Sequence, residues 1–412
     1  MTTYITYTLP NGLRVALLPT HSKVAYCGFA IRSGSRDDPE AYPGLAHFVE
    51  HMLFKGTKHR KAWHIINRME LVGGELNAYT TKDNTFVYTS APKRDLVRSI
   101  ELLNDIIRNS IYPQKELEKE RVVVADEINL YKDSPSEQIY DDFEEYLFSD
   151  NSLGHPILGA YESLMRMSSE TCRSYAAQAF VPEKMIFFCM GQITEKRFSY
   201  LVEKYLSDPF EAKTITNRGT EKIEVTHFDK KIETQTFQAH TLIGGEAPRL
   251  IDHQRTEASV LLNILAGSSM NCRLSVLLRE QKGWVYGVES GLSVLPDVGW
   301  WQLYFGSDPI HAIPALETTL KELESIKKNS ITPTALRAWV KQLKGQAAMA
   351  TENSESTFLN FGRQLLLKGK YDDLEMMYKR LDGVTLESLH EVANMIFHER
   401  NISTLIYEGK EE

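Results

Sequence analysis

The sequence predicts an α+β fold of two homologous-looking α/β sandwich domains, each with a mainly antiparallel sheet packed against helices. Three observations lead to this prediction. Short strand patterns stand between long helical patterns, the same order of elements recurs in the second half, and 412 residues exceed what one core usually accommodates. We expect a domain at 1–210, a linker at 211–222 and a domain at 223–412, because the linker mixes charges with glycine and shows no amphipathic period.

The first half opens with a predicted hairpin. Strand patterns at 5–9 and 13–18 flank Pro10-Asn11-Gly12, whose Asn-Gly step suits the positive φ angles of a tight turn. The periodicity of the following residues predicts, in order, a strand at 24–33, helices near 44–55 and 60–72, strands near 75–81 and 84–91, long helices between 93 and 148, and a strand at 185–190.

The second half repeats this order of elements. Its patterns predict a strand near 232–243, helices near 254–266 and 271–281, strands near 285–294 and 299–306, several helices, and a last strand near 402–407. The repeat is one of element order and not of residue identity. It therefore indicates a duplicated α+β unit, in which the second half follows the plan of the first.

The composition excludes several classes of partner. A formal net charge of −8 argues against a nucleic acid or an anionic membrane, because either would require clustered Lys and Arg. The four cysteines are far apart and include no C-x-x-C pair, so we expect them to be reduced and buried. No leader pattern opens the chain, and no uninterrupted apolar window of about 18 residues occurs. We therefore expect a cytoplasmic protein.

The segment 44–54 carries two histidines one helical turn apart. Its apolar residues recur with the spacing of a helix that packs on a core. At 100° per residue, His47 and His51 lie about 40° apart on one face, so both imidazoles can reach a single ion, with Glu50 beside them. Catalytic zinc takes three protein ligands and keeps a position for water. A third ligand must therefore come from elsewhere in the chain.

A second predicted helix, at 113–128, offers acidic candidates for that ligand. Glu120 and Glu127 are seven residues apart and share one face, and Val123 and Val124 between them suggest that this face points inward. An inward carboxylate needs a partner, and a metal cation is one. Simpler interpretations are a histidine pair hydrogen-bonded within a core, Glu50 at the surface, and Glu120 paired with a nearby lysine.

Two of these segments together resemble a known family. Residues 44–57, GLAHFVEHMLFKGT, closely resemble the signature of the pitrilysin-like zinc metallopeptidases, the inverzincins, which include insulin-degrading enzyme and the mitochondrial processing peptidase. The pair at 120 and 127 resembles the downstream acidic pair of that family. The resemblance extends over nearly the whole chain, from the opening hairpin to the final helices.

The resemblance implies a role for each residue of the pattern. His47, His51 and Glu127 would bind one Zn²⁺ per chain, and Glu50 would be the general base that takes a proton from metal-activated water. Glu120 would belong to the catalytic group as a supporting carboxylate that orients the site. The activity implied is that of a zinc-dependent endopeptidase that cleaves unfolded or short peptides.

Two further segments resemble substrate-binding parts of the family. Residues 73–81, GGELNAYTT, resemble an edge strand to which an extended peptide adds by main-chain hydrogen bonding, with Asn77 and Ala78 as contacts. Residues 273–287 resemble the C-terminal motif in which an arginine and a tyrosine approach the substrate. Arg279 and Tyr286 occupy those catalytic and substrate-binding positions, although a surface arginine and a strand aromatic would give the same pattern.

The number of domains bears on the expected partners. Long relatives carry four such domains, whereas this chain has two, so we expect a homodimer, or a heterodimer with a sister chain. Three other functions stay open at this point. They are a zinc-binding but non-catalytic subunit of a larger complex, a heteromeric peptidase subunit, and a structural zinc protein or peptide-binding module, in which a fourth protein ligand would complete the metal site.

Overall fold

The computed structural model describes residues 3–210, 221–328 and 330–410. The chain forms two compact units. Unit 1 consists of Met1–Leu130, His155–Asn217 and Ala350–Asp373, and unit 2 of Tyr131–Gly154, Arg218–Met349 and Leu374–Glu412. Each unit thus contains a segment from the other half of the chain, which the predicted consecutive domains do not anticipate. The predicted linker lies, except for residues 221 and 222, outside the described residues.

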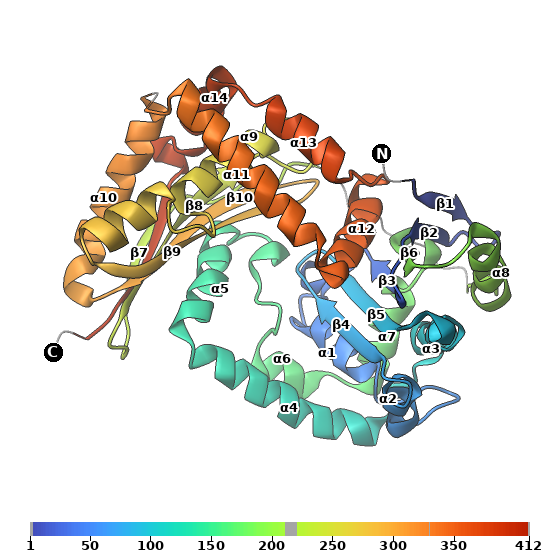
Figure 1. The fold of residues 1–412 in the computed structure, drawn as a ribbon. Helices are drawn as coiled ribbons and strands as arrows, with labels where there is room; N and C mark the ends of the chain where they lie inside the picture. The colour runs from blue at the N-terminus through green and yellow to red at the C-terminus, as the bar shows by residue number, and fades with distance from the viewer. Residues whose placement is uncertain (1–2, 211–220, 329, 411–412) are drawn as a thin grey trace. The chain divides into compact units, whose positions relative to one another are not determined.

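Unit 1 is built on a six-stranded sheet (Figure 1). All neighbouring strands are antiparallel except β2 and β6, and Gly12 in the first hairpin has the positive φ, 88°, that the Asn-Gly step predicts. The edge strand β4 pairs only with β5 among the described strands. In sheet order the strands are β1 (Ile5–Thr8), β2 (Arg14–Pro19), β6 (Met185–Gly191), β3 (Val24–Ile31), β5 (Thr85–Pro92) and β4 (Glu75–Thr80).

Alternating side chains of this sheet enter two separate cores. Val15 and Leu17 of β2 face a large core with most of the helices, whereas Ala16 and Leu18 face a smaller core beneath α12. The helices of the large core are α1 (Leu45–Met52), α2 (Ala62–Glu70), α3 (Leu96–Asn109), α4 (Gln114–Lys132), α6 (Tyr161–Arg166), α7 (Ser169–Ala179) and α8 (Glu195–Leu206).

Helix α12 (Ser354–Lys368) comes from the second half of the chain, yet it covers the sheet of unit 1. The rings of Phe188 on β6 and Phe358 on α12 stack with their centroids 4.3 Å apart. Gly362 allows this approach, because a Cβ atom there would lie 2.4 Å from the Phe188 ring. Close packing therefore fixes this helix against the sheet.

Unit 2 is built on a five-stranded sheet in which only β11 and β7 are parallel. The single strand predicted at 232–243 is wrong: the chain turns at 234–238, where the Thr236 hydroxyl donates to the Gln238 carbonyl, and β7 and β8 lie on either side of β11. In sheet order the strands are β7 (Asp229–Glu233), β11 (Ser403–Glu408), β8 (Ala239–Ala247), β10 (Gly299–Ser307) and β9 (Val285–Val294).

The helices of unit 2 also cover both faces of its sheet. Helix α5 (Pro135–Leu147), from the first half of the chain, packs on one face, while most of the others pack on the opposite face. The helix predicted near 271–281 is present, and over Ser275–Gln281 it is a π-helix, η5. The remaining helices are α9 (Arg255–Ala266), α10 (Pro309–Lys327), α11 (Pro333–Thr351), α13 (Leu374–Asp382) and α14 (Leu386–Ile396).

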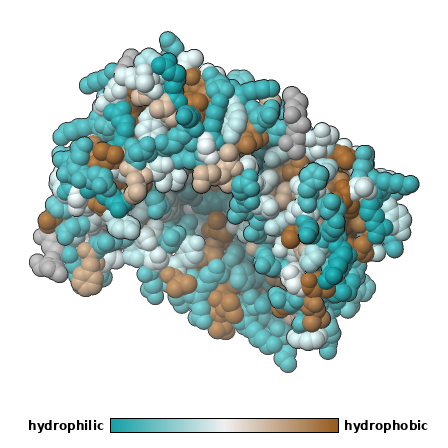
Figure 2. Space-filling model, in the orientation of Figure 1, coloured by the Kyte–Doolittle hydropathy of each residue, from teal (hydrophilic) through white to brown (hydrophobic). Residues whose placement is uncertain are grey.

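The predicted fold class is confirmed, because both units pack a mainly antiparallel sheet against helices. The four cysteines are buried and free, as expected. Among the described residues, no helix is both long and apolar enough to cross a membrane. On the face drawn in Figure 2, hydrophobic residues are scattered among more numerous hydrophilic ones.

Candidate metal centre

Helix α1 of unit 1 carries His47, Glu50 and His51, and its first turn is held by a carboxylate from the preceding loop. Asp38 accepts hydrogen bonds from the backbone N–H groups of Gly44 (2.7 Å) and Ala46 (2.8 Å). Asp38 thus satisfies two of the N–H groups that a helix leaves unpaired at its start. Burial raises the pKa of Asp38 to about 8, more than these hydrogen bonds lower it, so the contribution of Asp38 is the hydrogen bonding itself. An eight-residue helix is too short to be stable alone, so such contacts determine where the face with the two histidines points.

Tight backbone contacts and core residues also fix the position of α1. Gly44 has φ of 89°, and a Cβ atom there would lie 2.5 Å from the Leu158 carbonyl oxygen, so glycine is required. Phe48, Val49 and Met52 are almost completely buried in the large core. Because these apolar residues fix one face of α1 against the core, the two histidines lie at the edge of that core.

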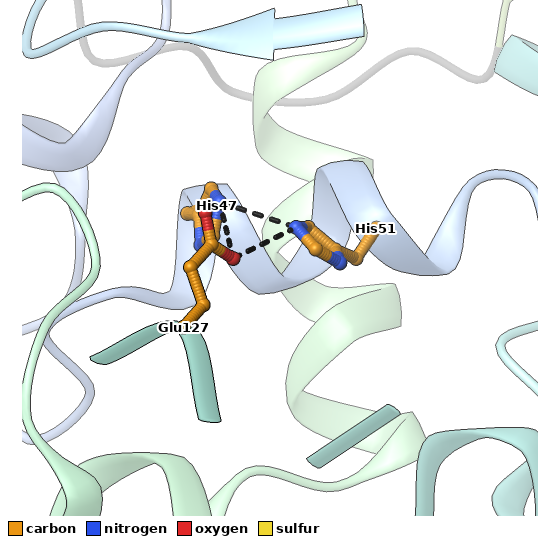
Figure 3. Close-up of side chains that lie close together, drawn as sticks. All are labelled: His47, His51 and Glu127. Atoms are coloured by element: carbon orange, nitrogen blue, oxygen red, sulfur yellow. Dashed lines mark hydrogen bonds and ion pairs between the residues drawn. The ribbon is translucent and has the colours of Figure 1, made fainter. Parts of the chain in front are cut away.

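Three donor atoms meet beside α1 (Figure 3). The Nε2 atoms of His47 and His51 are 3.2 Å apart, and Oε2 of Glu127 on α4 lies 3.8 Å from the first and 3.6 Å from the second. Zinc bonds of about 2.0–2.1 Å in tetrahedral geometry separate two ligand atoms by about 3.3 Å. The donor set and its spacing fit a zinc ion. Within the described part of the chain, no other group of three such residues is this close.

The two histidines differ in their electrostatic surroundings. Burial, together with a smaller effect of the nearby His51, lowers the pKa of His47 to about 3, so His47 is neutral near pH 7. Burial also lowers the pKa of His51, but its hydrogen bond with Glu120 and the charges of Glu50, Glu127 and Glu120 outweigh burial and raise it overall. Neutral imidazole nitrogens are the form that binds a metal.

Glu120 supports His51 and is not one of the three donors. With His51 Nδ1 as the donor to Glu120 Oε1, at 2.9 Å, the lone pair of Nε2 faces the donor group. Lys55 Nζ lies 2.6 Å from the other oxygen, Oε2. Burial raises the pKa of Glu120, but the hydrogen bonds with His51 and Lys55 outweigh it, and the pKa is lowered.

Glu50 lies beside the donor group and is only 8% exposed. The Thr80 hydroxyl of β4 donates to Glu50 Oε2 at 2.5 Å. Burial raises the pKa of Glu50, more than the Thr80 hydrogen bond and the charge of His51 lower it. A raised carboxylate pKa brings the group closer to neutrality, which favours proton transfer at ordinary pH.

Three of these contacting residues were not found from the sequence. Lys55 follows His51 by four positions, a helical spacing that could have identified it. Thr80 shares its strand face with Ala78, which could have placed both near α1. The contact of Asp38 with α1 had no signal in the sequence beyond an acidic residue before the helix.

The substrate-contact candidates Asn77 and Ala78 lie on β4. Asn77 is exposed, whereas Ala78 packs partly buried against the large core. Because β4 is an edge strand, one side of its backbone pairs with no described strand, which is what addition of an extended peptide requires.

The predicted Arg279 and Tyr286 come together within unit 2. Arg279 lies on η5, and its guanidinium carbon is 5.3 Å from the centre of the Tyr286 ring at the start of β9. Tyr286 is 88% exposed. A π-helix often occurs at a functional site. Contact of this pair with a substrate stays a prediction.

Comparisons with known proteins extend over both halves of the chain. The sequence profile described as Insulinase (Peptidase family M16) matches residues 14–161, and that described as Peptidase M16 inactive domain matches 166–343. The uncharacterized zinc protease YmxG of Bacillus subtilis is 32% identical over 403 residues, which cover 97% of each chain. The protein belongs to peptidase family M16.

One further relative is similar in sequence, and two solved structures are similar in fold. An uncharacterized zinc protease of Mycobacterium tuberculosis is 30% identical over 399 residues, covering 95% of this chain and 90% of that protein. A protease from Helicobacter pylori has the same fold, with a TM-score of 0.92 and 20% identity over 99% of this chain and 100% of that one. The M16 inactive-domain structure from Pseudomonas fluorescens has a TM-score of 0.88 and 16% identity over 100% and 98%.

The two M16 profiles separate the candidate residues. The first profile includes the segment from His47 to Glu127, and the second, described as inactive, includes Arg279 and Tyr286. The resemblance found in the sequence is thus confirmed for the family. The roles of the individual residues stay predictions.

Proposed function

We propose that this M16 protein is a zinc-dependent endopeptidase that cleaves unfolded or short peptides. The observation that carries the proposal is the approach of His47 Nε2, His51 Nε2 and Glu127 Oε2, with the Glu50 carboxylate beside them and outside the donor set. This arrangement supplies three ligands for one zinc ion and a separate base. Two relatives are named as uncharacterized zinc proteases, which also supports a zinc-dependent protease.

Zinc supplies Lewis acidity at such a site, which acidifies water and polarises a peptide carbonyl. Glu50 accepts the proton of the attacking water and passes it to the nitrogen of the leaving amine. Glu120 keeps the His51 ring oriented, and Lys55 keeps Glu120 in place. Because Glu50 acts on water, no side chain needs to form a covalent intermediate.

The substrate would bind as an extended strand along β4, next to Asn77 and Ala78. Such binding uses backbone groups, so it suits peptides without their own fold. Arg279 and Tyr286 would contact the same substrate in the assembled enzyme. We propose a cytoplasmic homodimer, with a heterodimer with a sister chain as the alternative. Light scattering during size-exclusion chromatography of the protein alone, combined with an activity assay, distinguishes a working homodimer from a chain that needs a partner.

A second candidate is a zinc-binding but non-catalytic subunit. The description of the second profile as an inactive domain favours it. The buried Glu50 favours catalysis, because a structural zinc site has no need of a fourth, unliganded carboxylate held at its edge.

The deciding experiment is hydrolysis of a quenched fluorescent peptide library, with and without chelator, together with zinc analysis. Glu50→Gln should retain zinc and lose most turnover, whereas His51→Ala should lose zinc. Glu118→Gln is the matched control, because Glu118 is exposed on α4 and hydrogen-bonds only Gln114 among the described residues. Zinc-loaded wild type without any cleavage would favour the non-catalytic subunit.

A further inference from the structure

Thr80 supplies the hydrogen bond that reaches the Glu50 side chain. Its Oγ1 lies 2.5 Å from Oε2, and no other described residue donates to that carboxylate. The other groups that act on Glu50 are charges, those of His51 and Glu127, which do not select between its two oxygens. The orientation of Glu50 therefore depends on one hydroxyl group.

The terminal torsion of a glutamate is broad and close to two-fold, so packing alone holds its carboxylate plane loosely. Proton transfer is sensitive to this orientation, because the accepting oxygen must lie within hydrogen-bond reach of the water. With Oε2 occupied by Thr80, Oε1 is the oxygen left to accept a proton. Thr80 itself is well fixed, because its side chain is β-branched and its backbone pairs with Thr85 in the sheet.

Thr80 also lies on the strand to which the substrate is expected to add. Ala78, two residues earlier on the same strand face, packs partly against the large core that contains α1, and Asn77 is exposed. One short strand therefore carries both the proposed peptide contacts and the group that orients the base.

We propose, resting on the peptidase function above, that Thr80 is the positioning residue of the general base: it holds Glu50 by Oε2 and presents Oε1 to the reacting water. Thr80 does not touch the reacting atoms. Its hydroxyl is directed to Glu50 and so is unavailable to the peptide. Its loss should therefore lower kcat and leave KM nearly unchanged.

The test compares Thr80→Val, which removes the hydroxyl at nearly constant shape, with Thr80→Ser, which keeps it. We expect kcat to fall about 10- to 100-fold in Thr80→Val, with KM within about twofold, and to return to within about threefold of wild type in Thr80→Ser. Zinc content should be unchanged in both. Thr80→Ala serves as a second variant without a hydroxyl and should show the same loss of kcat.

Thr85→Val is the matched control. Thr85 lies directly opposite Thr80 on β5, and its hydroxyl donates to the Ser33 carbonyl and not to Glu50. Thermal unfolding of each variant checks that it is folded. Loss of kcat in Thr85→Val equal to that in Thr80→Val would overturn the proposal, because the effect would then belong to the strand.

A double-variant cycle separates positioning from a structural role. If Thr80 acts through Glu50, Thr80→Val should cause no further loss in the Glu50→Gln background. An equal further loss there, or full kcat in Thr80→Val with an active wild type, would overturn the assignment of Thr80 alone. A wild type that binds zinc but cleaves no peptide would overturn the peptidase function, and the role of Thr80 with it.

Discussion

His51 and Glu120 are joined by a 2.9 Å hydrogen bond from Nδ1 to Oε1, on the side of the imidazole ring opposite Nε2, the proposed zinc ligand. The bond fixes the ring orientation and the tautomer with one contact. Lys55 Nζ lies 2.6 Å from the second oxygen of Glu120, so the series of contacts continues from His51 through Glu120 to Lys55.

Glu120→Gln should therefore weaken zinc binding while leaving all three ligands in place. We expect a loss of about 10- to 100-fold in zinc affinity, the usual effect of removing such a partner. Competition with a chromophoric chelator measures it, and Glu118→Gln on the exposed side of α4 is the control. Equal affinities for Glu120→Gln and wild type would show that the hydrogen bond does not tune His51.

Zinc affinity should fall as the pH decreases, because a single proton competes with zinc for the site. The pKa of His51 is raised overall, so a proton competes with zinc for His51 as the pH falls through that value. Burial lowers the pKa of His47 to about 3, so His47 adds no second proton near neutrality. Affinity should drop about tenfold per pH unit below the His51 pKa.

In the apoprotein, the contribution of His51 to folding stability should depend on pH in the opposite direction to zinc affinity. A raised pKa means that its contribution to folding is fully present below the unfolded value of about 6.5 and is lost as the pH rises through the folded value. Chelator competition across a pH series measures how zinc affinity depends on pH. In Glu120→Gln the midpoint of this pH dependence should move to lower pH, because the His51 pKa loses a partner that raises it. A slope of two protons would contradict the assignment of the competing proton to His51 alone.

Asp38 should contribute to both stability and metal binding through α1. Asp38→Ala leaves the N–H groups of Gly44 and Ala46 without their partner, at a cost of about 1–2 kcal/mol. Asp38→Asn keeps one acceptor and should fall between the alanine variant and wild type. Scanning calorimetry of the apoprotein and zinc titration measure the two effects, and an unchanged melting temperature in Asp38→Ala would exclude the cap.

The metal site shows how far sequence reasoning reaches. Helical spacing alone places His47 and His51 together, because residues four apart share a face. The same spacing makes Glu120 and Glu127 equivalent, and only family resemblance separated their roles. The Thr80 contact with Glu50 joins a strand to a helix 30 residues away, so it depends on packing that periodicity does not encode.

The units show a similar limit. The amphipathic patterns mark the apolar faces of α5 and α12, but not which sheet each face covers, and each helix packs in the unit formed mainly by the other half of the chain. The break between β7 and β8 was missed because five residues of turn lie within a run whose pattern predicts one strand.

Tyr286 offers a test of the second unit that is independent of folding. The residue is 88% exposed, and its hydroxyl has no hydrogen-bond partner among the described residues, so Tyr286→Phe should leave the melting temperature and zinc content unchanged. If the hydroxyl contacts substrate, kcat/KM should fall about 10-fold or more, the cost of one hydrogen bond to a developing charge. Tyr200→Phe, at an exposed position of α8, is the control. If Tyr286→Phe keeps the wild-type kcat/KM, the role of the tyrosine is limited to its ring, whose centre lies 5.3 Å from the Arg279 guanidinium carbon. Tyr286→Leu, which removes the ring, should then show the fall in kcat/KM instead.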